Sequence, residues 1–414
     1  MKTQFTKYQI FVISLLAFIQ FTVVLDFMIL SPLGVQVLEE LNISTKQFGL
    51  VVSAYAFSAG ASGILSAGFA DRFDRKKLLL FFYTGFVLGT VLCGIAPTYV
   101  ALLAARIITG IFGGVIASIS FAIIADLFPL EMRGRVMGFV MTAFAASQVF
   151  GLPLGVYISN LWGWQAPFLM IASVSASVGL IAFFYLKPIT SHLEGKAEKR
   201  ALQHLLHTVT NPGYLPGFLA TTLLATGGFM LMPFGSAFTV HNMGIPLEKL
   251  PLIYMVTGIA SIIAGPVIGR LSDTVGKYGM FVIASMAATC IILYYTSLGV
   301  SPVWFVIIIN CLLFISITGR MISANALTSA VPDLKDRGAY MAVSSSLQQL
   351  SGGVAATAAG FIVVQTPSGY LEGYQNLGYV VAFAILLTVI MMNRVNLLVN
   401  KKKAAKSVEV QLEF

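Results

Sequence analysis

The sequence has few charged residues. Only 10% of its 414 residues are Asp, Glu, Lys or Arg, whereas 57% are hydrophobic. In a soluble domain, roughly a quarter of all residues are charged, so this chain lacks the polar side chains that a water-facing surface requires. A lipid-facing surface does not require polar side chains. The composition therefore excludes an ordinary soluble domain and predicts a membrane protein with many spans.

Cysteine and histidine are also scarce. Cys93, Cys290 and Cys311 all lie in apolar stretches, which favours small buried side chains over disulfides or metal ligands. The histidines between residues 187 and 212 have no spacing that indicates a metal site. The sequence also contains no nucleophile and base at a catalytic spacing and no cofactor-binding loop. We therefore expect a protein that is not an enzyme and uses neither a metal nor a cofactor.

Long apolar stretches fill most of the chain. A transmembrane helix needs about 20 predominantly apolar residues, and twelve stretches meet this requirement. The first, which begins at Gln9, is too long for the core of a signal peptide and is interpreted as a span. The expected spans are 9–34, 46–70, 76–96, 98–127, 135–160, 163–186, 213–241, 247–271, 278–299, 302–330, 338–365 and 375–398.

The only long polar segment in the middle of the chain covers residues 187–212. It predicts a cytoplasmic linker, with a short surface helix over the stretch EKRALQHLLHTV. The expected architecture is an all-α membrane protein with twelve transmembrane helices in two pseudo-symmetric six-helix bundles. Residues 1–186 form the first bundle, and residues 213–414 form the second bundle and a cytoplasmic tail.

Positive charge is distributed unevenly between the loops. If the N-terminus is cytoplasmic, 21 of the 25 Lys and Arg residues lie on that side, Lys46 and Lys249 lie outside, and Arg106 and Arg320 lie within spans. Cytoplasmic loops typically carry such an excess, so both termini of this multi-pass cell-membrane protein are expected in the cytoplasm. The excess explains the net charge of +9 without a nucleic-acid partner. The run KKKAAK near the C-terminus is interpreted as an anchor to the lipid bilayer.

The second half of the chain repeats the first. Three residues recur 202 positions later: Phe27 as Phe229, Ile43 as Ile245 and Asp71 as Asp273. The stretch MRGRVM (132–137) resembles DRGAYM (336–341) at an offset of 204. Transporters built from two parallel repeats bind substrate near the membrane midplane, between the halves.

The loop after the second span carries the most specific motif. AGFADRFDRKKLL (67–79) and its repeat GRLSDTVGKYG (269–279) both resemble the G-x-L-A-D-R-x-G-R-K loop of the major facilitator superfamily. In the first copy, Ala67 and Asp74 replace the two glycines of the motif. The resemblance to this family covers nearly the whole chain, and it implies a transporter with the twelve-helix major facilitator fold.

In that family the loop is thought to stabilise the outward-open state. Because an acid can bind the positive N-terminal end of a helix, we expect Asp71 to face the helix that starts near Arg337. Asp273 is expected to face the helix that starts near Arg133, and both contacts form only while the cytoplasmic side is closed. Asp126 is expected beside Arg72 or Arg133. The residues expected at this cytoplasmic gate are Asp71, Arg72, Arg75, Asp126, Arg133, Asp273, Lys277 and Arg337.

The fourth and fifth spans indicate which branch of the family the chain resembles. Leu102, Arg106 and Gly110 are similar to the family's L-x-x-x-R-x-x-Q-G segment, and FGLPLG (150–155) resembles a degraded antiporter glycine–proline motif. With the single acid of the first span, these features resemble the twelve-span drug:proton antiporter branch. Glycine and proline can equally serve close packing and a helix bend, so the direction of transport stays open.

One acid interrupts the first span. Asp26 lies in FTVVLDFMILSP, with no charge nearer than Lys7 and Glu39. At about 1.5 Å per residue, Asp26, Arg106 and Tyr55 all lie at a similar depth, near the outer end of their spans. Because a lone charge is costly there, we expect Asp26 and Arg106 to pair. The pair is either a permanent structural contact or the proton-coupling site. We favour the second interpretation because intramembrane ionisable residues are commonly functional.

A third intramembrane charge is Arg320. We expect it near the midplane of the tenth span, where it contacts an anionic substrate group or Asp26, or instead hydrogen-bonds to Asn310, Ser323 or Asn325. The other candidate residues of the substrate cavity are polar side chains in spans, for each of which a hydrogen bond between helices is an equal alternative. They are Tyr55, Gln20, Gln148, Tyr254, Asn310, Gln348, Ser346 and Gln349.

The function favoured by these patterns is proton-coupled efflux of small organic molecules by alternating access. The expected ligands are a small molecule and protons, and a monomer is expected. An alternative is a proton symporter or facilitator that imports a metabolite such as a sugar or an organic anion, which Arg320 favours. From another class, a lipid flippase or a non-transporting receptor on the same fold also stays open.

Overall fold

The computed structural model describes residues 5–66, 73–190, 207–333 and 336–412, and most of them are helical. The N-terminal half contains α1 (Lys7–Ile29), α2 (Gly34–Glu40), α3 (Thr45–Ser66), α4 (Arg75–Gly94), α5 (Tyr99–Leu127), α6 (Leu130–Ala146), the π-helical turn η2 (Ser147–Gly151), α7 (Leu152–Trp162) and α8 (Ala166–Tyr185).

The C-terminal half has the same order of long helices. It contains α10 (Leu215–Phe229), η4 (Met232–Phe234), α11 (Gly235–Ala237), η5 (Phe238–Asn242), η6 (Leu247–Lys249), α12 (Leu250–Thr274), α13 (Lys277–Tyr295), α14 (Val303–Thr328), α15 (Arg337–Ile362), β1 (Val364–Gln365), β2 (Leu371–Glu372) and α16 (Tyr374–Leu412). The two short strands pair antiparallel, with Val364 opposite Glu372.

The predicted twelve-span all-α class is confirmed. Eleven helical segments of the described residues are long and apolar enough to cross a membrane. The twelfth is α15, which has 26 residues but carries a run of Ser and Gln side chains that lowers its hydropathy. Its polar character fits its position, because α15 packs against α3 of the other half.

Two expected boundaries differ from the structure. The first span ends at Ile29, earlier than Gly34, and the chain then turns into α2. The seventh span is interrupted after Phe229, where Pro233 cannot donate the backbone hydrogen bond of a continuous α-helix. The predicted linker helix falls mostly on residues 191–206, outside the described part of the chain. The domain boundaries at 186 and 212 therefore stay a prediction.

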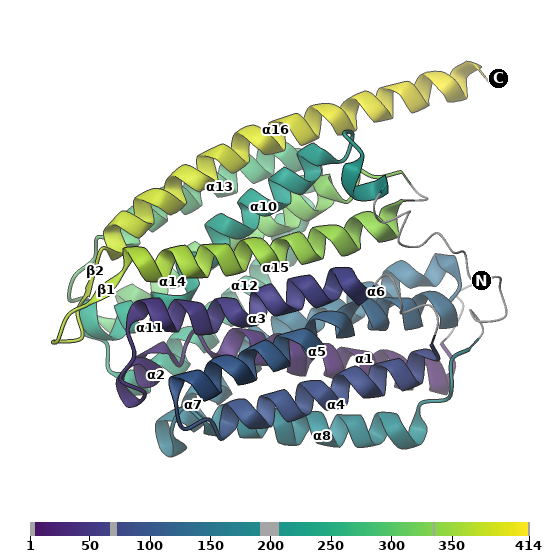
Figure 1. Ribbon diagram of the computed structural model, residues 1–414. Helices are drawn as coiled ribbons and strands as arrows, with labels where there is room; N and C mark the ends of the chain where they lie inside the picture. Colours follow the sequence, from purple (N-terminus) through teal and green to yellow (C-terminus); the bar gives the residue numbers. More distant parts are fainter. Residues whose placement is uncertain (1–4, 67–72, 191–206, 334–335, 413–414) are drawn as a thin grey trace.

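Figure 1 shows the long helices running side by side, with the start of α1 and the end of α16 on the same side of the molecule. We call this side, which carries Lys7 and Lys402, the terminal end. The opposite side carries α2 and the β1–β2 hairpin and is called the hairpin end.

Among the described residues, the apolar core is shared between the halves mainly at the hairpin end. There, one cluster of buried side chains combines residues of both halves, and the rings of Phe48 and Phe234 meet at 5.8 Å. Two further clusters draw their buried members from one half each, around Ile123 in the first and Phe218 in the second. The two halves are therefore joined most extensively at the hairpin end.

Glycines mark close contacts between the halves. A Cβ added to Gly49 of α3 would lie 2.8 Å from the carbonyl oxygen of Ala356, and one added to Gly360 of α15 would lie 2.8 Å from that of Thr45. Nearer the terminal end, a Cβ on Gly63 of α3 would lie 3.0 Å from the Ser346 hydroxyl oxygen of α15. The helices thus touch backbone to backbone at the hairpin end, and α3 stays in contact with α15 toward the terminal end.

Candidate functional site

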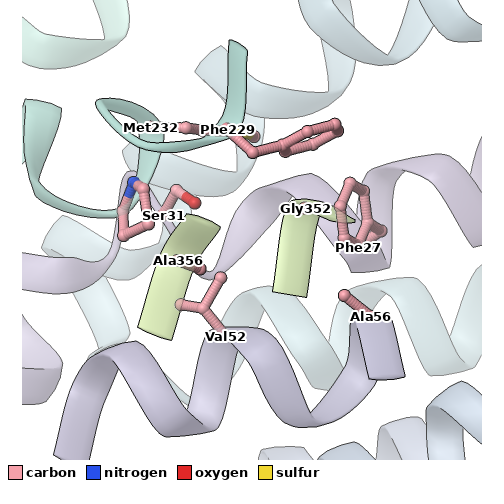
Figure 2. Close-up of a pocket in the computed structure, with 9 residues that line it drawn as sticks. Phe27, Ser31, Val52, Ala56, Phe229, Met232, Gly352 and Ala356 are labelled. Atoms are coloured by element: carbon pink, nitrogen blue, oxygen red, sulfur yellow. The ribbon is translucent and has the colours of Figure 1, made fainter. Parts of the chain in front are cut away.

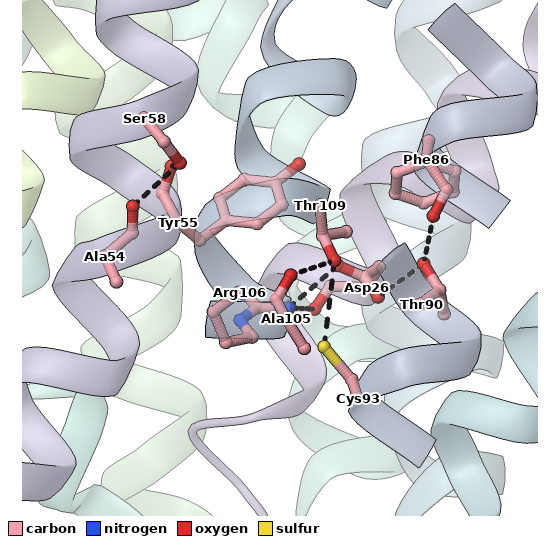
Figure 3. Close-up of polar contacts among 10 residues, drawn as sticks. All are labelled: Asp26, Ala54, Tyr55, Ser58, Phe86, Thr90, Cys93, Ala105, Arg106 and Thr109. Atoms are coloured by element: carbon pink, nitrogen blue, oxygen red, sulfur yellow. Dashed lines mark hydrogen bonds and ion pairs between the residues drawn. The ribbon is translucent and has the colours of Figure 1, made fainter. Parts of the chain in front are cut away.

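Asp26 and Arg106 form an ion pair inside the N-terminal half (Figure 3). Arg106 Nη1 lies 2.8 Å from Asp26 Oδ2 and 3.3 Å from the Asp26 backbone oxygen. Both side chains are excluded from solvent, at 0% exposure for Asp26 and 1% for Arg106. The pairing expected from their equal depths in two spans is confirmed, while its role in proton coupling stays a prediction.

Neighbouring helices complete the shell around this pair. Thr90 of α4 donates a hydrogen bond of 3.1 Å to Asp26 Oδ1. The guanidinium carbon of Arg106 lies 4.5 Å from the centre of the Tyr55 ring, at a distance typical of a cation–π contact. Arg106 Nε has no hydrogen-bond partner among the described residues. The pair is thus neutral as a unit, and one donor of its arginine is unused.

Small residues allow these helices to approach. A Cβ on Gly110 would lie 2.5 Å from the Tyr55 carbonyl oxygen, and one on Gly113 would lie 2.6 Å from the Tyr55 hydroxyl. On the opposite face of α5, a Cβ on Gly89 of α4 would lie 2.6 Å from the Thr109 hydroxyl oxygen. The glycine of the fourth-span motif therefore has a steric function, because it lets α3 bring Tyr55 onto Arg106.

The fifth-span glycines have a comparable role. A Cβ on Gly151 would lie 2.6 Å from Leu25, and one on Gly155 would lie 2.4 Å from Ile29, both in α1. The π-helical turn before Pro153 also contributes Ser147, whose hydroxyl donates to the Phe21 backbone oxygen at 3.0 Å. The FGLPLG stretch therefore packs tightly on the helix that carries Asp26.

Aromatic rings connect the ion pair to the interface between the halves. Tyr55 contacts Phe27 at 5.3 Å between ring centres, and Phe27 meets Phe229 of the other half at 5.8 Å in an edge-to-face arrangement. Phe27 and Phe229 are equivalent positions of the internal repeat. They also line a narrow apolar pocket between the halves (Figure 2). Its lining residues are Phe27, Ser31, Val52, Ala56, Phe229, Met232, Pro233, Gly352 and Ala356.

None of the polar side chains expected in the substrate cavity lines this pocket. Gln20 is buried and donates to Ser120 at 3.3 Å, within its own half. Asn310 donates to the backbone oxygen of Val306 at 2.9 Å. Tyr254 packs at the edge of the hairpin-end core. Gln148 and Gln348 are half-buried, in η2 and α15, and their contact with a substrate stays a prediction.

Arg320 lies near the middle of its helix, as expected, but its contacts differ from those expected. At about 1.5 Å per residue, it lies about 7 Å from the middle of α14 and about 12 Å from the end of this helix at Thr328. Its side chain faces α13, where Nε donates to Ser285 at 3.1 Å and the guanidinium lies 5.8 Å from the Phe281 ring. The helix is rotated so that Arg320 packs within its own half and does not contact Asp26.

The charges expected at the gate are only partly brought together. Asp126 pairs with Arg75 at 3.0 Å, whereas Arg133 donates to the carbonyl oxygens of Ala125 and Phe128. The expected position of Asp126 beside Arg72 or Arg133 stays a prediction. Asp71 and Arg72 lie outside the described residues.

Within the part of the chain that the structure describes, no hydrogen bond or ion pair joins the second copy of the loop to the other half. Asp273 pairs with Lys277 of the next helix, four residues later, and Arg337 is exposed. The contact of Asp273 with the start of α6 is not formed in this structure. This fits an arrangement in which the terminal end is not closed, the state in which the contact was expected to be broken.

A separate polar cluster lies at the terminal end of the C-terminal half. The Tyr214 hydroxyl donates to Asp336 at 2.6 Å, and Lys402 pairs with Asp333 at 3.0 Å. Burial, followed by the hydrogen bond to Asp336, raises the pKa of Tyr214 to about 12. This cluster fastens the end of α16 to the loop that precedes α15.

The chain is similar to many known proteins. The model of the Major Facilitator Superfamily matches residues 16–356. The chain is 24% identical to the uncharacterized MFS-type transporter YceJ of Bacillus subtilis (strain 168), over 95% of this chain and 98% of that protein. It is 29% identical to YtbD, an uncharacterized MFS-type transporter of the same strain, over 57% of this chain and 58% of that protein.

A third relative is Multidrug resistance protein 3 of the same strain, which is 34% identical over 38% of this chain and 30% of that protein. Among solved structures, a bacterial homologue of the human lysosomal transporter Spinster, in an inward-facing and unoccupied conformation, superposes with a TM-score of 0.77. That match has 15% sequence identity and covers 96% of this chain and 99% of the other, so it supports the fold alone.

Proposed function

The chain belongs to the major facilitator superfamily of transporters, and from this premise we propose that it exports small organic molecules in exchange for protons. The observation that carries the proposal is the Asp26–Arg106 pair. In this pair, the one acid of the first span is fully buried beside an arginine. Both residues belong to the N-terminal half, which also contributes to the central interface. An ionisable group at such a depth is by default functional.

Burial makes protonation of Asp26 depend on conformation. In the present arrangement the two charges cancel, and a proton on Asp26 would leave Arg106 buried without a counter-charge. Breaking a buried pair in this way costs about 3–5 kcal/mol. Asp26 therefore holds a proton only in a state in which water or substrate reaches the site. Proton binding is thereby linked to the change between the two states of the transporter.

A chain of aromatic contacts connects the Asp26–Arg106 pair to the interface between the halves. Tyr55 rests on Arg106 and touches Phe27, which in turn touches Phe229 across the interface. If Arg106 moves when Asp26 is protonated, the Tyr55 ring moves with it. Phe27, which contacts Tyr55 and lines the apolar pocket, then moves as well. The pocket has a volume of only about 10 Å³ in this arrangement, so an organic substrate enters only by separating Phe27 from Phe229. Such a substrate and a proton on Asp26 thus act on the same rings.

We place the terminal end in the cytoplasm because nearly all Lys and Arg residues of the loops lie there. The shared core at the hairpin end and the pairing of Asp273 within its own half support an inward-facing arrangement. Apolar lining of the pocket supports a lipophilic substrate. The similarity to Multidrug resistance protein 3 supports efflux over import.

Transport in liposomes with an imposed pH gradient tests the proposal. Ethidium, a lipophilic aromatic cation, serves as the first probe, followed by neutral lipophilic dyes. The wild type should accumulate a dye against its gradient, and Asp26→Asn should not. Asp333→Asn is the matched control, because Asp333 is an acid outside the spans whose partner is Lys402.

The double variant Asp26→Asn/Arg106→Gln guards against misfolding, since it leaves no uncompensated buried charge. It should still exchange labelled for unlabelled dye without a pH gradient, while gradient-driven accumulation is lost. Equal gradient-driven accumulation by wild type and Asp26→Asn would refute the coupling role of Asp26.

A further inference from the structure

The hairpin end contains a second meeting point of repeat-equivalent residues. Glu39 of α2 and His241 of η5 are separated by 202 positions, the same offset that relates Phe27 to Phe229. In both cases the two equivalent residues touch each other across the halves. Such contacts lie on the pseudo-twofold axis, where any relative movement of the halves changes them directly.

Glu39 and His241 differ from the aromatic pair in being titratable. His241 Nε2 lies 3.4 Å from Glu39 Oε1 and has no hydrogen-bond partner among the described residues. The His241 side chain is 15% exposed, whereas that of Glu39 is 59% exposed. A protonated imidazole therefore has an acceptor within ion-pair distance, and a neutral one has no partner of comparable strength.

The imidazole is held in place by the hairpin. The ring lies so close to Gly369, which has a φ of 86°, that a Cβ on this residue would come within 2.6 Å of His241 Nδ1. The next residue, Asn242, donates to the Leu371 carbonyl oxygen at 3.0 Å and accepts from the Leu371 amide at 2.9 Å. His241 thus keeps its orientation toward Glu39 while the halves are together.

Water reaches the pair through a surface cavity of about 580 Å³ between α2, the start of α3 and the hairpin. Glu39 and His241 are the only titratable residues that line it. On the elements packed around it, none of the other described charged or titratable side chains pairs with His241. These are Glu40 on α2, Lys46 on α3, Glu248 and Lys249 on η6, Tyr370 in the hairpin and Glu372 on β2.

We propose that Glu39 and His241 form a proton-binding latch that closes the hairpin end. In the orientation given under the proposed function, on which this inference rests, the latch faces the cell exterior and is distinct from the buried Asp26 site. An exterior proton on His241 completes an ion pair that exists only while the two halves touch. Low external pH therefore stabilises the closed hairpin end, and high external pH weakens it.

The test measures how often the hairpin end opens. Ser236 is buried there and donates to the Ser31 carbonyl oxygen of the other half at 2.9 Å, so a cysteine at this position reacts only after opening. The three native cysteines are replaced by Ala, and Ser236→Cys is alkylated in nanodiscs by a membrane-impermeant maleimide. Its rate is divided by that of exposed Val300→Cys, which removes the pH dependence of the thiol itself.

The background is Asp26→Asn/Arg106→Gln, so that Asp26 contributes no titration and failure of the proposed coupling does not affect the result. Between pH about 8 and pH about 5.5, on either side of the usual histidine pKa, the relative rate should fall about two- to fivefold, as expected for a partly exposed ion pair. His241→Gln and Glu39→Gln should abolish the fall.

The repeat supplies a matched control. Because the two positions are equivalent, the exchange Glu39→His/His241→Glu should restore the pH dependence, whereas His241→Lys should keep the rate low at both pH values. The proposal is overturned if His241→Gln keeps the full pH dependence, or if the exchanged pair shows none.

Discussion

Replacement of Gly49 by alanine should drive the hairpin end open. In α3, the new Cβ would lie 2.8 Å from the Ala356 carbonyl oxygen and 3.2 Å from the Gly360 Cα. Favourable contacts between heavy atoms begin near about 3.5 Å, so α3 and α15 must separate by several tenths of an ångström. Both neighbours are backbone atoms and cannot rotate away.

The cost of such overpacking is about 1–3 kcal/mol, and it applies only while the halves touch. Alanine also favours the helix over glycine by about 1 kcal/mol, but α3 is helical in both states, so this gain cancels in their ratio. The population ratio of open to closed hairpin ends should therefore rise by roughly 5- to 150-fold.

Distances between spin labels measure this ratio. Trp162 at the end of α7 and Val300 before α14 lie in different halves and are 72% and 88% exposed, so labels there should not disturb packing. Gly134→Ala is the control, because its Cβ would meet nothing within 4 Å. A Gly49→Ala distance distribution identical to that of the wild type would refute the interpretation of this contact as a state-dependent closure.

Two further changes have defined outcomes. Tyr214→Phe removes the hydrogen bond to Asp336 and should lower the free energy of unfolding by about 1–2 kcal/mol, as measured by thermal or denaturant unfolding. The pKa of Tyr214 is raised to about 12. The contribution of this hydrogen bond to the free energy of unfolding should therefore be constant below pH about 10 and be lost as the pH rises through 12. A loss of this contribution between pH about 6 and 8 would contradict the prediction. Arg320→Gln should leave gradient-driven transport within about twofold of wild type, because Arg320 contacts Ser285 and Phe281 of its own half. It has no acidic partner among the described residues that its removal would leave uncompensated. A loss of transport with an unchanged melting temperature would restore Arg320 as a substrate residue.

The sequence predicts the parts of this structure that depend on length and depth. A stretch of about 20 apolar residues has few alternatives to a membrane helix, so the twelve spans could be predicted from the apolar stretches of the sequence. The pairing of Asp26 with Arg106 followed from counting residues along two antiparallel spans, because two charges at one depth are costly apart.

Side-chain contacts that depend on the rotation of a helix about its own axis could not be predicted in the same way. Arg320 was expected in the central cavity, but a small rotation of α14 directs it at Ser285, and hydropathy is nearly equal on all sides of such a helix. Similarly, Gln20 and Asn310 satisfy their side chains locally. Thr90, which bonds Asp26, carries no signal in a single sequence, because threonines that hydrogen-bond within their own helix are common.

The internal repeat contained more information than the expected sites used. The offset of 202 that relates Phe27 to Phe229 also relates Glu39 to His241, and both pairs meet across the halves. Positions near a twofold axis contact their own equivalents, but the offset is the same for every aligned pair and does not say which pairs lie near the axis. These contacts therefore required the structure, as did the break after Phe229, which depends on Pro233 in one half only.

The central claim is that Asp26 exchanges a proton during the transport cycle. Infrared difference spectroscopy during a pH titration observes the carbonyl stretch of a protonated carboxylic acid directly. As the pH falls, the wild type and Asp333→Asn should both gain a band for a buried protonated carboxyl group, and Asp26→Asn should lack it. If no band depends on Asp26 at any pH at which the protein stays folded, then Arg106 holds Asp26 ionised throughout, and the pair is a structural contact.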